Sequence, residues 1–334
     1  MGDWSNLHLI KEATEEHYHK GDDILALVEY YWLDKICAYG EFPVFVNDFH
    51  KIWETAQNRF RELKAKVCPI LSKTTFIHGT QCEKKLWLYK NRYSERTISP
   101  ETQAAFDRGN MIGELAQKLF PGAIDINGED NLLLKSYDYM YIDNSCKALP
   151  FYLKQLLKVR FTKMELEKNK ALFEAAFLYD ENIFFAIDIL SYEKGKRIAY
   201  EVKSSTEIKD IYIEDSALQY YVMSHNIQID DFVLVYINND YLNAIGISMS
   251  ELTVDNCDIN KLFLRKSILS EVLNLQPTIS KKASIFKNII SKDKAPMLKM
   301  GAQCNRPYEC MFRHYCERKC ELECNYGKLE KAQA

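Results

Sequence analysis

The stretch from residue 171 to residue 240 most constrains the fold, because its apolar residues follow strand periodicity in four runs. The strand runs are residues 171–180, 182–192, 196–205 and 230–240. Residues 150–169 predict a helix before the first run, and residues 214–225 predict another before the last. The order is therefore helix, three strands, helix, strand, and we expect an α/β fold with a mixed-sheet core of the type α-β-β-β-α-β.

The second and third strand runs predict a hairpin that carries three charged side chains. Counting outward from a two-residue turn at Lys194-Gly195 pairs Asp188 with Glu201. Lys203 shares a face with Glu201, because side chains two positions apart in a strand point the same way. Directly opposed like charges destabilise a sheet, and a divalent cation between the two carboxylates would remove that cost. Such oxygen ligands suit Mg²⁺ or Mn²⁺, and a neighbouring lysine suits phosphodiester hydrolysis by a metal-activated water. The alternative is a hairpin whose charged face is simply solvated.

The N-terminal region has a different character. Residues 1–62 contain 12 acidic and 6 basic residues, and their apolar positions follow helical spacing. We therefore expect residues 1–67 to form an acidic helical extension, followed by one larger domain over residues 68–334. An acidic extension could dock on a basic protein partner. The sequence shows no secretory signal and no apolar run of membrane length, so we expect a cytoplasmic protein without membrane contact.

Half of the 10 cysteines lie close together near the C-terminus. They are Cys304, Cys310, Cys316, Cys320 and Cys324. Without a secretory signal, this spacing favours metal or iron–sulfur ligation over disulfides. The last four of these thiols alone would suit a tetrahedral Zn²⁺ site, and a third alternative leaves Cys320 and Cys324 without a role.

Basic side chains gather in the predicted helix over residues 150–169. Four of them are candidates for contact with a nucleic-acid backbone, namely Lys154, Lys158, Arg160 and Lys163. A strip of this kind can follow phosphates along a strand. The alternative is a solvated helix face.

Together these motifs resemble the PD-(D/E)XK nuclease superfamily, and within it the RecB-like branch that carries an iron–sulfur cluster. Asp188 in "AID" is similar to the first acidic motif, and Glu201 with Lys203 in "EVK" to the second. Gln219 in "DSALQYY" is similar to the glutamine of the helix motif that follows them. The segment "RGNMIGELAQ" resembles the first helix of the family; Gly113 stands at the usual histidine, with Glu114 next to it.

The cysteines extend the resemblance, which covers roughly residues 70–318. Cys82 in "CEKKLWLYK" resembles the single upstream cysteine of this branch, and "CNRPYECMFRHYC" supplies Cys304, Cys310 and Cys316. The branch includes the CRISPR adaptation nuclease, and the sequence is also similar to an uncharacterised bacterial subfamily. The resemblance implies a restriction-endonuclease-like core and a 4Fe-4S cluster held by these four cysteines, with structural Zn²⁺ as the alternative cofactor.

The function that the resemblance implies is a Mg²⁺- or Mn²⁺-dependent DNA nuclease, exonuclease-like on ends or single strands. Asp188 and Glu201 would hold the metal, with Glu114 as a candidate extra ligand. Lys203 would activate water and Gln219 would orient the site. The alternative is a catalytically inactive module with the same fold that binds nucleic acid or a protein partner.

Overall fold

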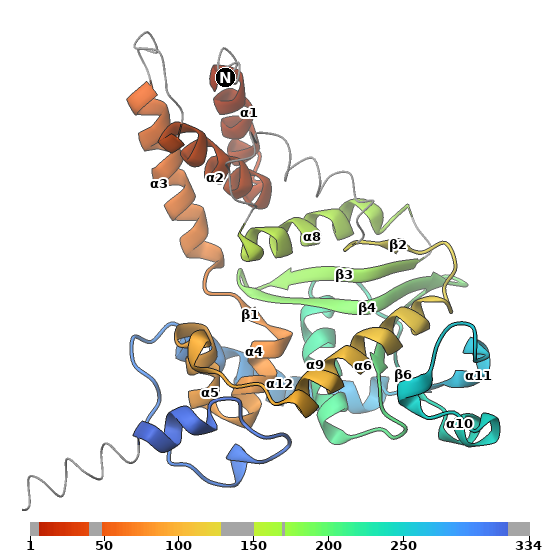
Figure 1. Ribbon diagram of the computed structural model, residues 1–334. Coiled ribbons are helices and arrows are strands. Elements are labelled where there is room, and N and C mark those ends of the chain that lie inside the picture. The colour runs from red at the N-terminus through yellow and green to blue at the C-terminus, as the bar shows by residue number, and fades with distance from the viewer. Residues whose placement is uncertain (1–6, 40–48, 128–149, 169–170, 320–334) are drawn as a thin grey trace, which may run out of the picture. The chain divides into compact units, whose positions relative to one another are not determined.

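A computed structural model describes residues 7–39, 49–127, 150–168 and 171–319 of the chain (Figure 1). The chain divides into two compact units. The first unit comprises residues 1–70 and 122–197, and the second comprises residues 71–121 and 198–334. Over the described ranges, no helix combines the length and the apolar character needed to cross a membrane.

Among the described residues, the helices of the first unit are α1 (Leu7–His19), α2 (Asp23–Tyr39), α3 (Phe49–Val67) and α8 (Phe151–Glu165). Helix α2 packs against the other three. Its apolar side chains Leu25, Val28 and Leu33 are buried, as expected for a helix that is covered by neighbours on several sides.

The strands of the first unit are β2 (Ile124–Asp125), β3 (Ala171–Tyr179) and β4 (Ile183–Glu193). Strand β2 pairs in parallel with β3, and β3 pairs antiparallel with β4. Helix α8 covers β3, and the Thr162 hydroxyl accepts a hydrogen bond of 2.8 Å from the Ala176 amide. Most residues of β3 and β4 are buried, because most of their side chains are apolar on both faces of the sheet.

The turn after β4 has the predicted form. Strand β4 ends at Glu193 and β5 (Lys196–Lys203) begins after a two-residue loop, in which Lys194 and Gly195 both have positive φ, 51° and 80°. Two left-handed residues in a two-residue loop are typical of a type I′ hairpin turn. This confirms the turn that was expected from the sequence, whereas the pairing of Asp188 with Glu201 stays a prediction.

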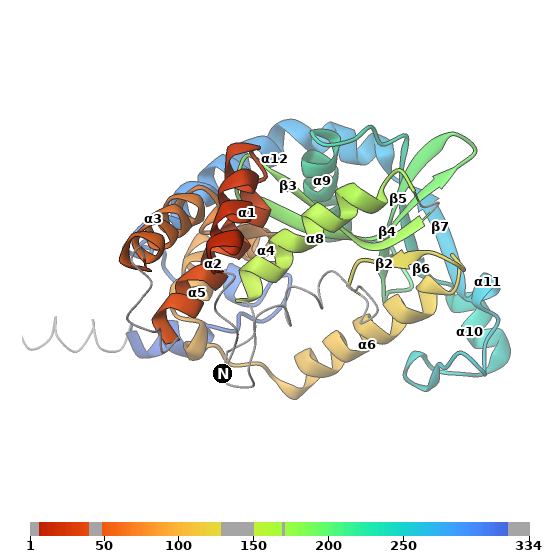
Figure 2. The same ribbon diagram turned by 90° about the horizontal axis from the view of Figure 1, so that it is seen from above.

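The second unit begins with β1 (Leu71–Ser72), α4 (Lys73–Gln81), α5 (Glu83–Asn91), η2 (Tyr93–Glu95) and α6 (Pro100–Gln117). After β5 it continues with α9 (Asp210–Ser224), β6 (Asp231–Ile237), α10 (Asn239–Ile245), η3 (Met249–Glu251), α11 (Ile259–Leu262), β7 (Phe263–Ser267), α12 (Leu269–Ile290) and η4 (Ala302–Cys304). Strand β5 runs parallel to β6, with α9 in the connection, and β6 pairs antiparallel with β7. Helix α12 packs along α9 and also contacts α4 and α5 (Figure 2).

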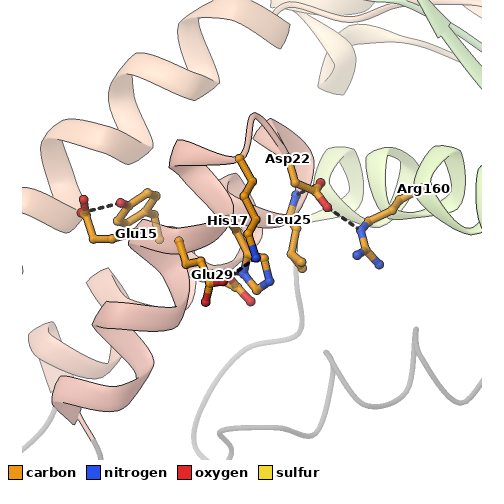
Figure 3. Close-up of polar contacts among 9 residues, drawn as sticks. Glu15, His17, Asp22, Leu25, Glu29 and Arg160 are labelled. Atoms are coloured by element: carbon orange, nitrogen blue, oxygen red, sulfur yellow. Dashed lines mark hydrogen bonds and ion pairs between the residues drawn. The ribbon is translucent and has the colours of Figure 1, made fainter.

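The element order α8-β3-β4-β5-α9-β6 is the predicted α-β-β-β-α-β order. The strands belong to a mixed sheet of seven strands, so the fold is mixed α/β. The compact units nevertheless differ from the two regions expected from the sequence. Residues 1–67 do not stand apart: α2 packs on α8, and Arg160 Nε of α8 donates to Asp22 Oδ2 at 3.0 Å (Figure 3).

Candidate active site and cysteine pocket

Glu201 is a buried carboxylate in β5 with a 1% exposed side chain. Its Oε1 accepts hydrogen bonds from Lys203 Nζ at 2.6 Å and from Lys73 Nζ at 2.6 Å. Its Oε2 accepts one from Gln219 Nε2 of α9 at 2.9 Å. The structure therefore brings together Glu201, Lys203 and Gln219, three of the residues that the sequence motifs singled out.

Two further residues complete this group. Asp215 of α9 accepts a hydrogen bond from Lys203 Nζ on Oδ2 at 2.5 Å, and Lys73 Nζ lies 3.6 Å from the same oxygen. Two carboxylates and two ammonium groups thus alternate around the site. We call Lys73, Glu201, Lys203 and Asp215 the charge cluster. Its formal charges cancel, which is the condition under which buried charges are tolerated.

The charge cluster keeps Glu201 ionised. Burial alone would raise the pKa of this carboxyl group, but the ammonium groups of Lys203 and Lys73 outweigh burial and hold the pKa well below its usual range. The group is therefore a fixed anion at neutral pH, and its two ammonium partners are fixed next to it.

Two oxygen atoms beside the charge cluster lack a partner. Asp215 Oδ1 and Gln219 Oε1 are buried, and within the described residues neither has a hydrogen-bond partner. A buried acceptor without a partner costs about 1–3 kcal/mol, so this site suits a water molecule or a cation. Oxygen atoms of this kind are the ligands that Mg²⁺ and Mn²⁺ prefer. Within the same residues, no three His, Cys, Asp or Glu side chains lie close enough together to hold a metal ion.

Local structure explains how these side chains reach the site. Helix α4 begins at Lys73, after a capping box between Ser72 and Thr75, and this fixes the first turn and its lysine. Asp215 and Gln219 lie four residues apart in α9, so both project from one helix face. The sequence reasoning missed Asp215, which this i,i+4 spacing from Gln219 could have indicated. It also missed Lys73, for which no local signal exists.

Asp188 lies in the first unit, at a half-buried position in β4. The pairs Phe173–Ile189 and Ala175–Ile187 flank it, and this register places Glu174 opposite Asp188. Glu174 has a φ of 56°, which is unusual for a side chain other than glycine inside a strand. A second acidic residue therefore accompanies Asp188 in the first unit.

The first-helix motif is less complete. Glu114 is exposed on α6, and within the described residues it forms no hydrogen bond or ion pair with the charge cluster. A Cβ atom added at Gly113 would meet nothing within 4 Å. Position 113 therefore has room for a side chain, and its role as a ligand position stays a prediction.

The expected basic strip on α8 is only partly at the surface. Lys158 is buried, with 9% exposure, and burial lowers its pKa. Arg160 is paired with Asp22, while Lys154 is half-buried and Lys163 is exposed. Of the four candidates, Lys158 is thus part of the protein interior and Arg160 is part of an internal ion pair, because α8 packs between β3 and α2.

Some acidic side chains of residues 1–67 form contacts within this region. His17 Nδ1 lies 2.8 Å from Glu29 Oε2, and the Tyr30 hydroxyl donates to Glu15 Oε1 at 2.6 Å (Figure 3). These contacts join α1 to α2, and the partner-binding role of this region stays a prediction.

The four cysteines expected to hold an iron–sulfur cluster line one pocket of the second unit. They are Cys82, Cys304, Cys310 and Cys316. The hollow is small, with a cavity volume of about 20 Å³, and it is partly open to solvent. Cys82 lies at the junction of α4 and α5, Cys310 is buried, and burial raises the pKa of the Cys310 and Cys316 thiols. We call this feature the cysteine pocket. Cys320 and Cys324 lie outside the described residues.

Hydrogen bonds hold the upstream helices to the segment that carries the last three cysteines. Gln81 Nε2 donates to the carbonyls of Gln303 at 2.9 Å and Tyr308 at 2.7 Å. The Thr97 amide donates to the Met311 carbonyl at 2.8 Å. Residues more than 200 positions apart are therefore joined around the pocket.

Comparison with protein-family models, with curated proteins and with solved structures gave no significant match for this chain.

Proposed function

We propose that this protein is a Mg²⁺- or Mn²⁺-dependent DNA nuclease with a restriction-endonuclease-like core. The observation that carries the proposal is the buried carboxylate of Glu201, which Lys203 and Gln219 contact directly. A buried strand carboxylate with a lysine two positions later and a glutamine from the following helix is the arrangement that the PD-(D/E)XK resemblance predicts. The unpartnered oxygens of Asp215 and Gln219 add acceptors that a hard cation would satisfy.

Each side chain has a defined role in this proposal. Glu201 and Asp188 are the proposed metal ligands, and the geometry adds Asp215 as a candidate. When bound, the ion would supply an activated water and neutralise charge on the phosphate. Lys203 lies close enough to both Glu201 and Asp215 to donate a hydrogen bond to a water oxygen or a phosphate oxygen beside them. Gln219 fixes the orientation of the Glu201 carboxylate.

One observation favours the second candidate, a module without catalytic activity. Lys73 and Lys203 both contact Glu201 Oε1, so the charge that an ion would supply is already present. A metal ion at this oxygen would have to displace an ammonium group. If no displacement occurs, the site is a neutral structural cluster and the chain binds nucleic acid or a protein partner without cleaving it.

We also propose that the cysteine pocket holds a 4Fe-4S cluster with a structural role. The donor set is chemically suitable, because four thiols and no carboxylate line the pocket. Thiolates around a cluster are further apart than thiolates that share one Zn²⁺ ion, since iron and sulfide atoms lie between them. Thiols spread around a hollow therefore fit a cluster better than a single Zn²⁺ ion. Anaerobically purified protein that is colourless and contains stoichiometric zinc would contradict this part of the proposal.

The activity is tested with end-labelled linear and single-stranded DNA in the presence of Mg²⁺ or Mn²⁺. We expect the wild-type protein to shorten the labelled strand, and Glu201→Gln and Lys203→Met to reduce the rate by at least about 100-fold. Glu214→Gln is the matched control, because this neighbour of Asp215 pairs with Lys282 outside the charge cluster. DNA binding without cleavage under all metal conditions would favour the module instead.

A further inference from the structure

A buried lysine lies in the wall of the cysteine pocket. Lys85 of α5 is 6% exposed and lines the pocket with the four cysteines. Its Nζ donates a hydrogen bond of 2.5 Å to Gln81 Oε1, a neutral amide. Within the described residues, no carboxylate forms an ion pair with it. The charge cluster offers the contrast, because each of its lysines contacts a carboxylate there.

Burying an ammonium group without a counter-ion is costly, and proteins normally pair such a charge or neutralise it. Burial lowers the pKa of Lys85, and the nearby thiols of Cys310 and Cys82, which line the same pocket, act in the opposite direction. Thiolates are anions when they bind metal. When a metal group binds and the thiols lose their protons, the resulting thiolates thus supply the negative charge that Lys85 otherwise lacks.

Gln81 links this lysine to the segment that carries the other ligands. Its Oε1 accepts from Lys85, while its Nε2 donates to the carbonyls of Gln303 and Tyr308, which precede Cys304 and Cys310. The ammonium group is therefore held in place on the pocket wall through an amide that makes three hydrogen bonds.

We infer that Lys85 is the internal counter-ion of the cluster that the four cysteines hold, and that it raises the reduction potential of that cluster. This inference rests on the proposed 4Fe-4S group and not on nuclease activity. A 4Fe-4S cluster with four thiolates is an anion, and uptake of one electron makes it more negative. A fixed positive charge next to it stabilises the reduced form more than the oxidised form. Net charge and hydrogen bonding around the sulfur atoms are known determinants of such potentials.

The pocket provides a matched control. Lys299 also lines it, but its side chain is exposed, so water and salt screen its charge. Lys85→Met and Lys299→Met remove the same charge from a buried and an exposed position. Lys85→Arg keeps the charge, and Lys85→Gln provides a polar neutral variant should Lys85→Met fail to fold.

The experiment is a potentiometric titration of the full-length protein after anaerobic reconstitution with iron and sulfide. Dithionite supplies the electrons, and visible absorbance and electron paramagnetic resonance report the oxidation state. We expect Lys85→Met and Lys85→Gln to shift the midpoint to more negative potential, Lys85→Arg to stay near the wild type, and Lys299→Met to shift it much less. Equal midpoints in the Lys85→Met, Lys85→Gln and wild-type proteins would overturn the inference, as would a protein that takes up no iron. Absence of DNA cleavage would leave these readouts unaffected, so the two proposals fail separately.

Discussion

The charge cluster and the cysteine pocket each bury an ionisable side chain, but the two side chains have different kinds of partner. Glu201 is an anion whose two oxygens accept three hydrogen bonds, two of them from ammonium groups. Lys85 is a buried lysine whose hydrogen-bond partner is a neutral amide; burial lowers its pKa, and the nearby thiols of Cys310 and Cys82 act in the opposite direction. The first site is electrically complete as it stands, whereas the second becomes complete when its thiols ionise. We therefore look for a ligand next to Lys85, where the described residues supply no carboxylate, rather than next to Glu201, where they supply two ammonium groups.

The largest effect should come from removing the anion of the complete site. Glu201→Ala removes one of the two carboxylates that Lys73 and Lys203 share, and it removes the acceptor of the Gln219 hydrogen bond. Breaking a buried ion pair in this way costs about 3–5 kcal/mol. We expect a loss of this size in the free energy of unfolding measured with urea.

The adjacent residue serves as the control for that experiment. Glu214 pairs with Lys282 at a partly exposed position, so Glu214→Ala should cost about 0–1 kcal/mol. Similar losses in both variants would mean that burial of Glu201 contributes little, and the contrast between the two regions would be wrong.

Much of the core could be predicted from the sequence because its signals are local. The type I′ turn at Lys194-Gly195 and the change from helical to strand periodicity depend on neighbouring residues. Gln219 was found because the motif places it at a fixed distance after the strand. Lys73 could not be found in this way, because it reaches Glu201 from 128 positions away.

The burial of basic side chains on α8 could not be predicted from the sequence either. Lysine has a long apolar stem, so a helix can bury it at a position that composition alone assigns to the surface. Lys158 is buried for this reason, and Arg160 is engaged by Asp22 from the N-terminal helices. Both outcomes depend on which elements pack on α8, and the sequence pattern does not contain that information.

The two regions should respond to acid in different pH ranges. His78 lies one turn before Cys82, and burial lowers its pKa to about 3. Between pH 6.5 and pH 3 the imidazole is therefore neutral in the folded protein, whereas in the unfolded chain it takes up a proton. This stabilising contribution is present above pH 6.5 and is lost as the pH falls, by about 1.4 kcal/mol per pH unit. The folded pKa of Glu201 is lowered below 4.5, so its contribution is present above that pH and is lost only in stronger acid.

Urea unfolding at about pH 7, 6, 5 and 4 separates these contributions. We expect His78→Phe to flatten the stability profile between pH 6.5 and 4.5, because the ring that packs against Tyr89 is kept and the titrating group is removed. Glu201→Gln should change the profile only below about pH 4.5. An unchanged slope in His78→Phe would show that this histidine is not held neutral by burial.

In the metal-free protein, replacing a lysine by methionine should lower the free energy of unfolding in the charge cluster and leave it unchanged or raise it in the cysteine pocket. Lys73→Met removes a partner from a buried anion and should destabilise by about 1–3 kcal/mol. Lys85→Met replaces a buried cation without a carboxylate partner by an apolar side chain of similar size, and such changes are neutral or stabilise by about 1–4 kcal/mol. Thermal and urea unfolding after iron removal provide the comparison.

Binding of a 4Fe-4S cluster in the cysteine pocket should then reverse the effect on the free energy of unfolding for only one of these two substitutions. With the cluster bound, Lys85 has its counter-charge, so Lys85→Met should become destabilising while the effect of Lys73→Met stays as it was. Destabilisation by Lys85→Met in both forms would indicate that this lysine is already paired without a cluster.

The smallest effect tests whether the charge cluster can take an ion despite being electrically complete. Gly113 lies inside α6, and a Cβ atom there would meet nothing within 4 Å. Gly113→Ala should therefore stabilise the protein by about 0.5–1 kcal/mol through helix propensity alone. Gly113→His adds the ring that the proposed nuclease resemblance predicts at this position, and we expect it to tighten Mn²⁺ binding and raise the rate of DNA cleavage.

Gly113→Ala is the control that separates these two effects, because it adds a methyl group without a metal ligand. Mn²⁺ affinity is measured by titration calorimetry, and cleavage is measured with end-labelled DNA at several Mn²⁺ concentrations. Tighter binding in Gly113→His alone would mean that an ion can compete with Lys73 and Lys203 for Glu201 once a further ligand is present. Equal affinity in both variants would mean that α6 does not contribute to the site, and that Lys73 and Lys203 supply the positive charge next to Glu201.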